Sequence, residues 1–370
     1  MMNVQELTQK HKLLECIHCG ICTGSCPVAR KAHLNVRKYM REVSTDGKLT
    51  IHPQDELWSC TTCATCGLRC PKEINPYEFL IDIRSLAVEE GQIATTLRDA
   101  LESTFKNGNP WGRIRSKRSE WAQGLDIKHA SQGVEFLYYV GCTSAYDPRV
   151  QNVAKSLAKC LKLAGVDFGT LGDEENCCGN EVFGMGEKGL FDFLVEENVK
   201  LFNKYSVKQI VTNCPHSYHS FKNRYGQTGF EVLHHTQLLA DLVNKEKLKF
   251  SNAINKAVIY HDPCFIGKQN NVYDEPRRVL ENLPGVKLVE FERRRERSLC
   301  CEGGGGRMWV DIPGERLAEM RVKDAAEAGA EILAVACPFC LLTFEDAVKT
   351  TGLEGKLQIL DVAELVAQAI

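Results

Sequence analysis

Near its N-terminus the sequence reads Cys16-Ile17-His18-Cys19-Gly20-Ile21-Cys22-Thr23-Gly24-Ser25-Cys26-Pro27, with the spacing C-x2-C-x2-C-x3-C-P. The same spacing returns at Cys60-Thr61-Thr62-Cys63-Ala64-Thr65-Cys66-Gly67-Leu68-Arg69-Cys70-Pro71. It is typical of chains that hold two [4Fe–4S] clusters, in which three closely spaced thiolates bind one cluster and the fourth, ahead of proline, binds the other. One cluster is therefore predicted on Cys16, Cys19, Cys22 and Cys70, and the second on Cys60, Cys63, Cys66 and Cys26.

Zinc is the alternative metal for such cysteines. A structural zinc site needs four thiolates, usually as two short pairs, so it leaves the third cysteine of each run and the trailing proline unexplained. Gly20, Gly24 and Gly67 are expected to let the backbone approach the inorganic cores. Residues 33–43, between the motifs, have the pattern of a helix. We therefore predict a helical ferredoxin domain rather than a compact β type.

The composition places the chain among ordinary globular proteins with an unusual cysteine content. It has 370 residues, 44% hydrophobic and 25% charged, a formal net charge of -2 and 18 cysteines. The balance of charge gives no sign of a nucleic-acid partner. We see neither a secretory leader nor a membrane-spanning stretch, so a cytoplasmic protein is expected, with any membrane association through a partner subunit. Clustered cysteines in a reducing compartment indicate metal ligands.

Beyond residue 134 the sequence repeats itself. Cys142, Cys177-Cys178 and Cys214 recur as Cys264, Cys300-Cys301 and Cys337. Strand-like runs precede the first and last cysteine of each copy, at residues 136–140, 209–212, 257–260 and 332–335. Helical spacing at residues 150–164 and 313–328 alternates with these runs. We predict a mixed architecture: a helical ferredoxin domain at 1–87, a helical linker at 88–133, and two α/β lobes related by duplication at 134–250 and 251–370.

The second copy is complete, because Cys337-Pro338-Phe339-Cys340 adds a fifth cysteine. Adjacent cysteines such as Cys300-Cys301 rarely both bind a single metal ion, since consecutive side chains diverge, whereas a multinuclear cluster accommodates both. Residues 303–306 are four consecutive glycines, which would let the chain curl around a bulky group. No Gly-Lys-Ser/Thr follows, so they are not a phosphate loop.

This order of cysteines resembles the cysteine-rich CCG domain of the heterodisulfide reductase B subunit, and the N-terminal part resembles the C subunit of that enzyme. The fused arrangement is similar to the D subunit of its membrane-linked form. The resemblance implies a noncubane [4Fe–4S] cluster, at which a disulfide is cleaved in two one-electron steps, on Cys264, Cys300, Cys301, Cys337 and Cys340. Glu302 stands where the motif has glycine and leaves these five cysteines intact.

The resemblance implies an iron–sulfur electron-transfer subunit of a heterodisulfide reductase-like oxidoreductase complex. Electrons would pass through the two cubane clusters to the noncubane cluster, which handles a disulfide/thiol or similar two-electron couple. The alternative is a non-catalytic relay between a flavoprotein and a quinone-linked or other redox partner. Partners would be a flavin-containing subunit, a membrane cytochrome or quinone-linked subunit, or both, in a hetero-oligomeric complex without nucleic acid.

The first copy departs from the motif, because Ser217 stands in the fifth position. A neutral hydroxyl is a poor ligand for iron compared with thiolate. The remaining cysteines, Cys142, Cys177, Cys178 and Cys214, leave three interpretations open: a zinc or otherwise simplified metal site, an altered iron–sulfur cluster, or an empty structural relic. His216 and His219 are candidates to replace the missing ligand.

Four further features carry weaker signals. Residues 184–189 match G-x-G-x-x-G but follow no obvious strand, so dinucleotide binding is not predicted. The basic runs at residues 113–118 and 293–297 are interpreted mainly as solvated faces, with docking of a partner as the alternative and, for the second run, binding of an anionic substrate. Cys160 is expected to be an ordinary buried thiol. His261 is interpreted as fixing its loop, or as a proton donor to a leaving thiolate.

Overall fold

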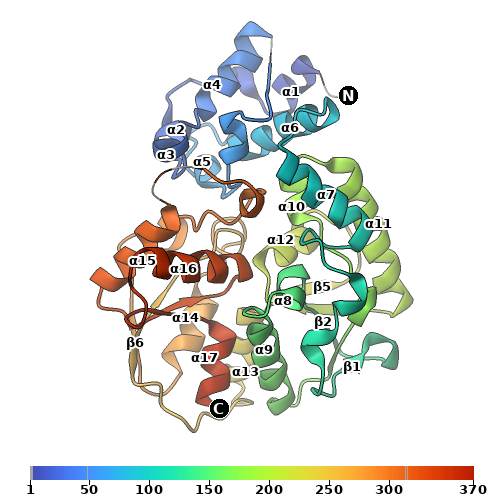
Figure 1. The fold of residues 1–370 in the computed structure, drawn as a ribbon, viewed down its shortest axis with the longest axis vertical. Coiled ribbons are helices and arrows are strands. Elements are labelled where there is room, and N and C mark those ends of the chain that lie inside the picture. The colour runs from blue at the N-terminus through green and yellow to red at the C-terminus, as the bar shows by residue number, and fades with distance from the viewer. Residues whose placement is uncertain (1–2, 48, 313, 315) are drawn as a thin grey trace.

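The computed structural model describes residues 3–47, 49–312, 314 and 316–370. Figure 1 shows a helical N-terminal domain above two α/β lobes that lie side by side. The N-terminal domain is built from short helices joined by the cysteine loops: α1 (Val4–Lys10), α2 (Ile21–Gly24), α3 (Ala29–Ala32), α4 (Val36–Arg41), α5 (Thr65–Leu68) and α6 (Pro76–Glu89). The helix α7 (Thr95–Asn107) then leads toward the first lobe.

The single helix predicted over residues 33–43 is wrong at its start. His33 has a left-handed backbone with φ of 55° and ends α3, so α4 begins only at Val36. The side chain of Asn35 caps α4 by accepting a hydrogen bond from the backbone N–H of Lys38. A π-helical turn continues α4 over Glu42–Asp46.

Lobe 1 contains a five-stranded parallel sheet in the order β1-β3-β2-β4-β5. The strands are β1 (Lys128–His129), β2 (Phe136–Tyr139), β3 (Phe168–Thr170), β4 (Gln209–Thr212) and β5 (Glu231–His234). Its helices are α8 (Cys142–Tyr146), α9 (Gln151–Leu163), α10 (Asn180–Gly184), α11 (Lys188–Lys204), α12 (Pro215–Asn223) and α13 (His235–Asn244).

Lobe 2 repeats the plan with four parallel strands in the order β7-β6-β8-β9. The strands are β6 (Lys256–Tyr260), β7 (Val286–Val289), β8 (Ile332–Val335) and β9 (Gln358–Asp361). The helices are α14 (Asp274–Glu281), α15 (Leu317–Glu327), α16 (Pro338–Thr350) and α17 (Val362–Ala369). The predicted mixed architecture with two duplicated α/β lobes is thus confirmed, as are the four predicted strands and the helix at residues 150–164. Of the segment predicted helical at 313–328, residues 313 and 315 lie outside the described residues, and α15 begins at Leu317.

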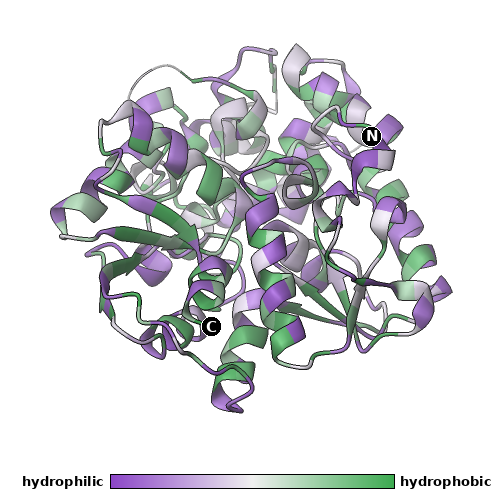
Figure 2. Ribbon diagram, turned by 60° about the horizontal axis from the view of Figure 1, so that its bottom comes forward, coloured by the Kyte–Doolittle hydropathy of each residue, from purple (hydrophilic) through white to green (hydrophobic). Residues whose placement is uncertain are grey.

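The strands are apolar on both faces because helices cover both sides of a parallel sheet. All residues of β2 and β8 are buried, and Figure 2 shows hydrophobic strands inside a shell of helices with polar outer faces. The two lobes share one core, in which α9 packs against α17.

The cysteines follow from this topology. In each lobe two neighbouring central strands, β2 with β4 and β6 with β8, end at the same edge, and their outer neighbours lie on opposite sides. This switch point, at the carboxyl ends of parallel strands, is where open α/β sheets place their sites. Cys142, Cys214, Cys264 and Cys337 lie just beyond these four strand ends.

Candidate functional site

Cysteines of the two N-terminal motifs surround two separate cavities. The first cavity is lined by Cys16, Cys19, Cys22 and Cys70, and the second by Cys26, Cys60, Cys63 and Cys66. The structure therefore brings together the same two sets of four that the spacing indicates, including the exchanged fourth cysteine of each. Loops with left-handed residues at Gly20 and Ala64 lead into α2 and α5, which present the third cysteine of each run.

The two sets differ in depth. Cys19 is exposed, and Ile17 beside it has an exposed fraction of 63%. Cys60, Cys63 and Cys66 are buried. Burial raises the pKa of Cys26 and of Cys66 far above the ordinary value for a thiol, and the neighbouring cysteines add to this effect. Four converging thiolates in such a place need positive charge at the centre, which iron supplies. The residues therefore fit a [4Fe–4S] cluster at each position.

The five cysteines of copy 2 converge from three loops of lobe 2. The sulfur atoms of Cys301 and Cys340 lie 3.2 Å apart, and Cys264 is hydrogen-bonded to Cys300. Burial opposes ionisation of Cys337, but hydrogen bonds with Cys340 and His216 outweigh it and lower the pKa of Cys337 to about 5. All 18 cysteines lie within the described residues, and all are free thiols. The donor set, five thiols with two of them adjacent, suits a multinuclear iron cluster.

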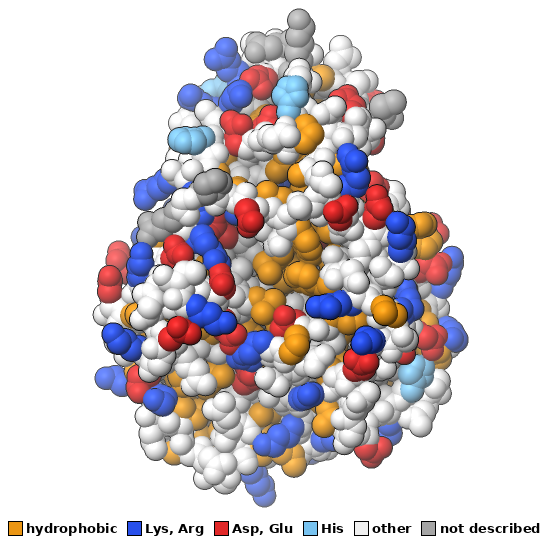
Figure 3. All heavy atoms as spheres, viewed as in Figure 1, with side chains coloured by type: hydrophobic (Ala, Val, Ile, Leu, Met, Phe, Trp, Pro, Cys, Tyr) orange, Lys and Arg blue, Asp and Glu red, His pale blue; other side chains and the backbone are white. Residues whose placement is uncertain are grey.

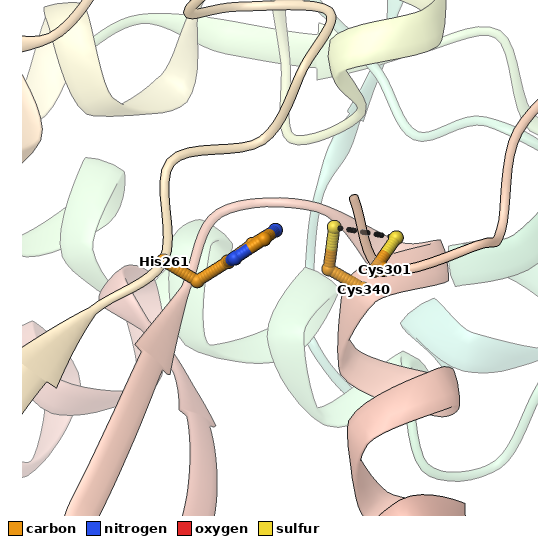
Figure 4. Close-up of side chains that lie close together, drawn as sticks. All are labelled: His261, Cys301 and Cys340. Atoms are coloured by element: carbon orange, nitrogen blue, oxygen red, sulfur yellow. Dashed lines mark hydrogen bonds between the residues drawn. The ribbon is translucent and has the colours of Figure 1, made fainter. Parts of the chain in front are cut away.

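His261 lies next to this set. Figure 4 shows its ring directed toward the sulfur atoms of Cys301 and Cys340, and one ligand atom from each of the three residues lies within 4.8 Å of the others. Arg321 donates from Nε to His261 Nδ1 at 3.3 Å. Burial, reinforced by the Arg321 charge, holds the pKa of His261 well below its ordinary value. A neutral imidazole is thus fixed against the copy-2 cysteines.

The glycine run lies between the copy-2 cysteines and the N-terminal domain. Gly303 donates its backbone N–H to Cys301 Sγ at 3.4 Å. The middle residues contact the N-terminal domain: a Cβ on Gly304 would lie 2.8 Å from the carbonyl oxygen of Thr61, and one on Gly305 would lie 2.5 Å from that of Cys60. Glu302, just before the run, has a left-handed φ of 71°. Its carboxylate compensates by accepting a 2.6 Å hydrogen bond from the backbone N–H of Leu317 and pairing with Lys31.

The buried N-terminal set and the copy-2 set touch each other. Cys63 is hydrogen-bonded to Cys300, and Cys300 Sγ lies 3.4 Å from Thr61 Oγ1. Cys26, Cys63, Cys264 and Cys300 belong to one small apolar contact cluster with Val28 and Leu317. Thiols that are 237 residues apart in sequence, Cys63 and Cys300, are therefore direct neighbours.

The four cysteines of copy 1 line a cavity of their own, together with Ser217. Hydrogen bonds connect Cys142 with Cys177, Cys177 with Cys178, and Cys178 with the Ser217 hydroxyl. The hydrogen bond with Cys177 and the charge of Arg118 lower the pKa of Cys142 to about 7 against the effect of burial. Because thiolates rather than thiols bind metals, this set is also suited to a metal ion.

The two candidate histidines of copy 1 have different surroundings. His216 lines the copy-1 cavity, but its ring forms a 2.8 Å ion pair with Glu181. The ring is also hydrogen-bonded to Cys337 of copy 2 and packs against Phe265 and Phe339. His219 lies away from the cavity lining and bonds to side-chain amides of Asn223 and Asn270. The structure thus places His216 between the two copies and leaves His219 outside the set.

Sequence reasoning missed several buried cations, among them Arg118, Arg84 and Lys268. Arg118, from a run taken for a solvated face, is 2% exposed; it pairs with Glu175 at 2.7 Å and donates to Cys142 Sγ at 3.5 Å. Arg84 of α6 donates to backbone carbonyls from all three parts of the chain. Lys268 lies between Thr65 and Ser298. No sequence signal separates these residues from exposed cations.

The remaining features behave more simply. Cys160 is fully buried in the core shared by the lobes, as predicted. The G-x-G-x-x-G match begins at the end of α10 rather than after a strand. In the second basic run, Arg293 pairs with Asp324 and Arg295 with Asp274.

Comparisons with known proteins agree with this geometry. The cysteine-rich domain (CCG) family matches residues 136–222 and 258–345, and the 4Fe-4S dicluster domain family matches residues 12–74. The chain is 38% identical over 330 residues to the probable iron-sulfur-binding oxidoreductase FadF of Bacillus subtilis, a match that covers 86% of this chain and 47% of that protein. It is 32% identical over 413 residues to EtfAB:quinone oxidoreductase of Syntrophomonas wolfei, covering 96% and 58% of the two chains.

A third relative matches along nearly its whole length. The D subunit of dihydromethanophenazine:CoB--CoM heterodisulfide reductase from Methanosarcina barkeri is 32% identical over 395 residues, covering 98% of this chain and 95% of the relative. The chain spans only about half to three-fifths of the length of FadF and of EtfAB:quinone oxidoreductase. Among the described residues, no helix is both long and apolar enough to cross a bilayer.

Proposed function

Since this chain belongs to the same iron–sulfur protein family as the D subunit of heterodisulfide reductase, we propose that it carries electrons within an oxidoreductase complex to a disulfide/thiol or similar two-electron couple. When bound, iron–sulfur clusters exchange single electrons, which divides a two-electron reaction into two steps. The contribution of the chain is to hold these clusters in a fixed order, to connect them and to keep water from the inner ones.

The proposed ligands are the cysteine sets described above. Cys16, Cys19, Cys22 and Cys70 hold the outer cubane cluster, and Cys26, Cys60, Cys63 and Cys66 hold the inner one. Cys264, Cys300, Cys301, Cys337 and Cys340 hold the noncubane cluster. The corresponding domain bounds, 1–87, 88–133, 134–250 and 251–370, remain part of the proposal.

The contact between Cys63 and Cys300 is the observation that carries the proposed route. It joins the inner N-terminal set to the copy-2 set without an intervening side chain. The outer set supplies the opposite end, because Cys19 is exposed and is flanked by Ile17, which is also exposed. A partner's redox group can approach that end, while the copy-2 thiols stay 5% exposed or less at Cys300, Cys301, Cys337 and Cys340.

The residues around the copy-2 set suit chemistry on sulfur. His261 is held by Arg321 with its ring toward Cys301 and Cys340. Figure 3 shows hydrophobic side chains gathered in the middle of one face, where the three parts of the chain meet. At this junction Trp111 packs against Trp309 and Phe339, with ring centroids 5.0 Å and 6.0 Å away. Trp111 and Phe339 also line the cavity of the copy-1 cysteines.

For copy 1 we propose a metal site held by the thiolates of Cys142, Cys177, Cys178 and Cys214. Arg118 supports this, because its buried charge faces Cys142 and favours the thiolate. The four-thiolate set suits zinc, and the adjacent pair Cys177-Cys178 suits an altered iron–sulfur cluster. Counting both metals in the full-length protein distinguishes them.

The proposed partners are redox proteins. A flavin-containing subunit and a quinone-linked or cytochrome subunit would deliver or remove electrons at the exposed outer end, in a hetero-oligomeric cytoplasmic or partner-anchored complex. A second candidate function is that of an electron relay, in which copy 2 passes electrons on and is not the site of disulfide chemistry. The resemblance to EtfAB:quinone oxidoreductase favours this candidate.

The experiment compares Cys301→Ala with Cys160→Ala in anaerobically purified full-length protein. Cys301→Ala should abolish turnover of glutathione disulfide and cystine and remove roughly four iron atoms per chain, while the EPR signals of the N-terminal clusters persist. Cys160→Ala, which removes a buried thiol outside every set, should leave turnover and iron content unchanged. Unchanged turnover in Cys301→Ala contradicts the proposal. Wild-type protein without turnover that exchanges electrons rapidly with a reduced flavoprotein supports the relay instead.

A further inference from the structure

A cavity of about 660 Å³ lies between the N-terminal domain and lobe 2. In Figure 1 its walls are found where α2, α3 and α5 stand above α15. The N-terminal domain contributes Cys26, Pro27 and residues of α5, and lobe 2 contributes the segment that leads into Cys300 and the first turns of α15. It is distinct from the cavities lined by the copy-1 and N-terminal cysteine sets, although Cys26 borders it.

The lining is strongly basic. Among the described residues that line it, one is acidic, Glu296, and six are basic: Arg30, Lys31, Arg69, Lys268, Arg293 and Arg297. Within the described part of the chain, Lys31 is paired with Glu302 and Arg293 with Asp324, but the other four have no carboxylate within ion-pair distance. Because like charges repel, this concentration of cations is unfavourable in the absence of an anion.

Lys268 is the most informative of these residues. Its side chain is 6% exposed, yet among the described residues its Nζ donates to neutral oxygens only, Thr65 Oγ1 and the carbonyl of Ser298, both at 2.7 Å. An ammonium group has three N–H donors, so one remains. Burying a cation against neutral groups costs free energy unless negative charge lies nearby. Lys268 lines the cavity, so an anion bound there would lie beside its ammonium group.

We propose that this cavity binds a polyanionic small molecule that presents phosphate or carboxylate groups. Its volume falls within the range of roughly 300 to 1,000 Å³ that small-molecule sites occupy. Arginine side chains such as Arg69 and Arg297 bind planar or tetrahedral oxyanions through paired hydrogen bonds. Leu299, Leu317 and Met320 add an apolar wall for an organic part of the ligand.

A bound anion would also affect the electron route. Since Cys26 borders the cavity, an anion bound there would place negative charge next to the inner cysteine set. This coupling rests on the proposed assignment of that set to the inner cluster. Added negative charge disfavours reduction of a nearby redox group. Binding is therefore expected to shift the midpoint potential of the inner cluster to more negative values.

The test uses anaerobically purified full-length protein and isothermal titration with two probes, inorganic pyrophosphate and citrate. Wild-type protein should bind at one site per chain. Arg297→Gln and Arg69→Gln should each weaken binding about tenfold, which is the effect of losing one charge-assisted hydrogen bond. The matched control is Arg294→Gln, because Arg294 is exposed, lies three residues before Arg297 and does not line the cavity.

The outcomes separate clearly. Binding of both probes supports a general polyanion site, and binding of pyrophosphate alone supports a phosphate-selective site. Absence of saturable binding by protein with full iron content overturns the proposal, as does equal weakening by Arg294→Gln. A redox titration with and without pyrophosphate tests the coupling separately, and an unchanged potential at saturation overturns it. Loss of disulfide turnover would leave the binding result standing, so the two proposals fail independently.

Discussion

Replacement of Arg84 by methionine should loosen the junction of all three parts of the chain. Arg84 is fully buried in α6, and its two terminal nitrogens donate to four backbone carbonyls. Two of these, from Leu57 and Cys60, belong to the N-terminal domain, and both are 2.8 Å away. The other two belong to Gly184 of lobe 1, at 2.8 Å, and Gly305 of lobe 2, at 3.0 Å.

The magnitude follows from these contacts. A hydrogen bond that involves a charged group contributes about 1.5 to 3 kcal/mol, but partial resolvation of the freed carbonyls reduces the sum. Breaking a buried charged network of this kind costs about 3 to 5 kcal/mol. Methionine fills most of the apolar volume, so the loss reports on the hydrogen bonds more than on a void. Arg84→Lys should fall between wild type and Arg84→Met, because one ammonium group does not reach four carbonyls.

The assay is thermal unfolding of the anaerobic protein, followed by circular dichroism together with the visible absorbance of the clusters. Arg84→Met should lower the apparent midpoint by roughly 5 to 10 °C. The control is Arg98→Met, which removes an exposed side chain of α7 that donates to the Gly91 carbonyl at 3.3 Å. It should change stability by less than about 0.5 kcal/mol. An Arg84→Met midpoint within 1 °C (about 0.5 kcal/mol by the same scale) of the control refutes this account of the junction.

Three further perturbations test the assembly and the ligand sets. Asp82 pairs with basic groups of α1 and α11, and although partial burial opposes ionisation, these partners hold its pKa well below the ordinary value. Since that stability is present above the unfolded pKa, Asp82→Asn should cost about 1 to 2 kcal/mol at pH 7 and at pH 5 after allowance for solvent screening, with the difference narrowing below about pH 4 in urea titrations. Cys70→Ala should remove the EPR signal of the outer cluster, and Cys26→Ala should remove that of the inner one. The reverse result would show that the fourth ligands are not exchanged between the two motifs. Cys214→Ala should lower the zinc or iron content of the purified chain while both N-terminal signals remain, and an unchanged content of both metals would argue against a metal site in copy 1.

Much of the candidate site could be predicted because metal-ligand spacing is a local property. Because only two residues separate neighbouring cysteines, Cys16, Cys19 and Cys22 stay within a short stretch of chain, and a loop followed by the short helix α2 is enough to direct them toward one cavity. The cysteine ahead of proline in each motif predicts a ligand for the cluster of the other motif. Cys70 accordingly lines the cavity of Cys16, Cys19 and Cys22. The strands before Cys142 and Cys337 were equally visible, because a doubly covered parallel strand is a short continuous apolar run.

Predictions from local sequence patterns were wrong or incomplete at three places. The helix expected from residue 33 starts late because His33 turns left-handed. Gly304 and Gly305 approach the carbonyl groups of Thr61 and Cys60 in the N-terminal domain, a contact that no local pattern indicated. The cation of Arg118, interpreted as solvated, is buried against Glu175 because the linker folds back onto lobe 1.

The sequence alone determined the two local triplets, Cys16 with Cys19 and Cys22 and Cys60 with Cys63 and Cys66, because covalent spacing limits how far apart neighbouring residues lie. Tertiary structure alone decided how the sets are connected: that Cys63 meets Cys300, that His216 of copy 1 reaches Cys337 of copy 2, and that cations from two domains face one cavity. Each of these contacts joins segments that only the packing of one domain on another brings together, and no local periodicity encodes that packing.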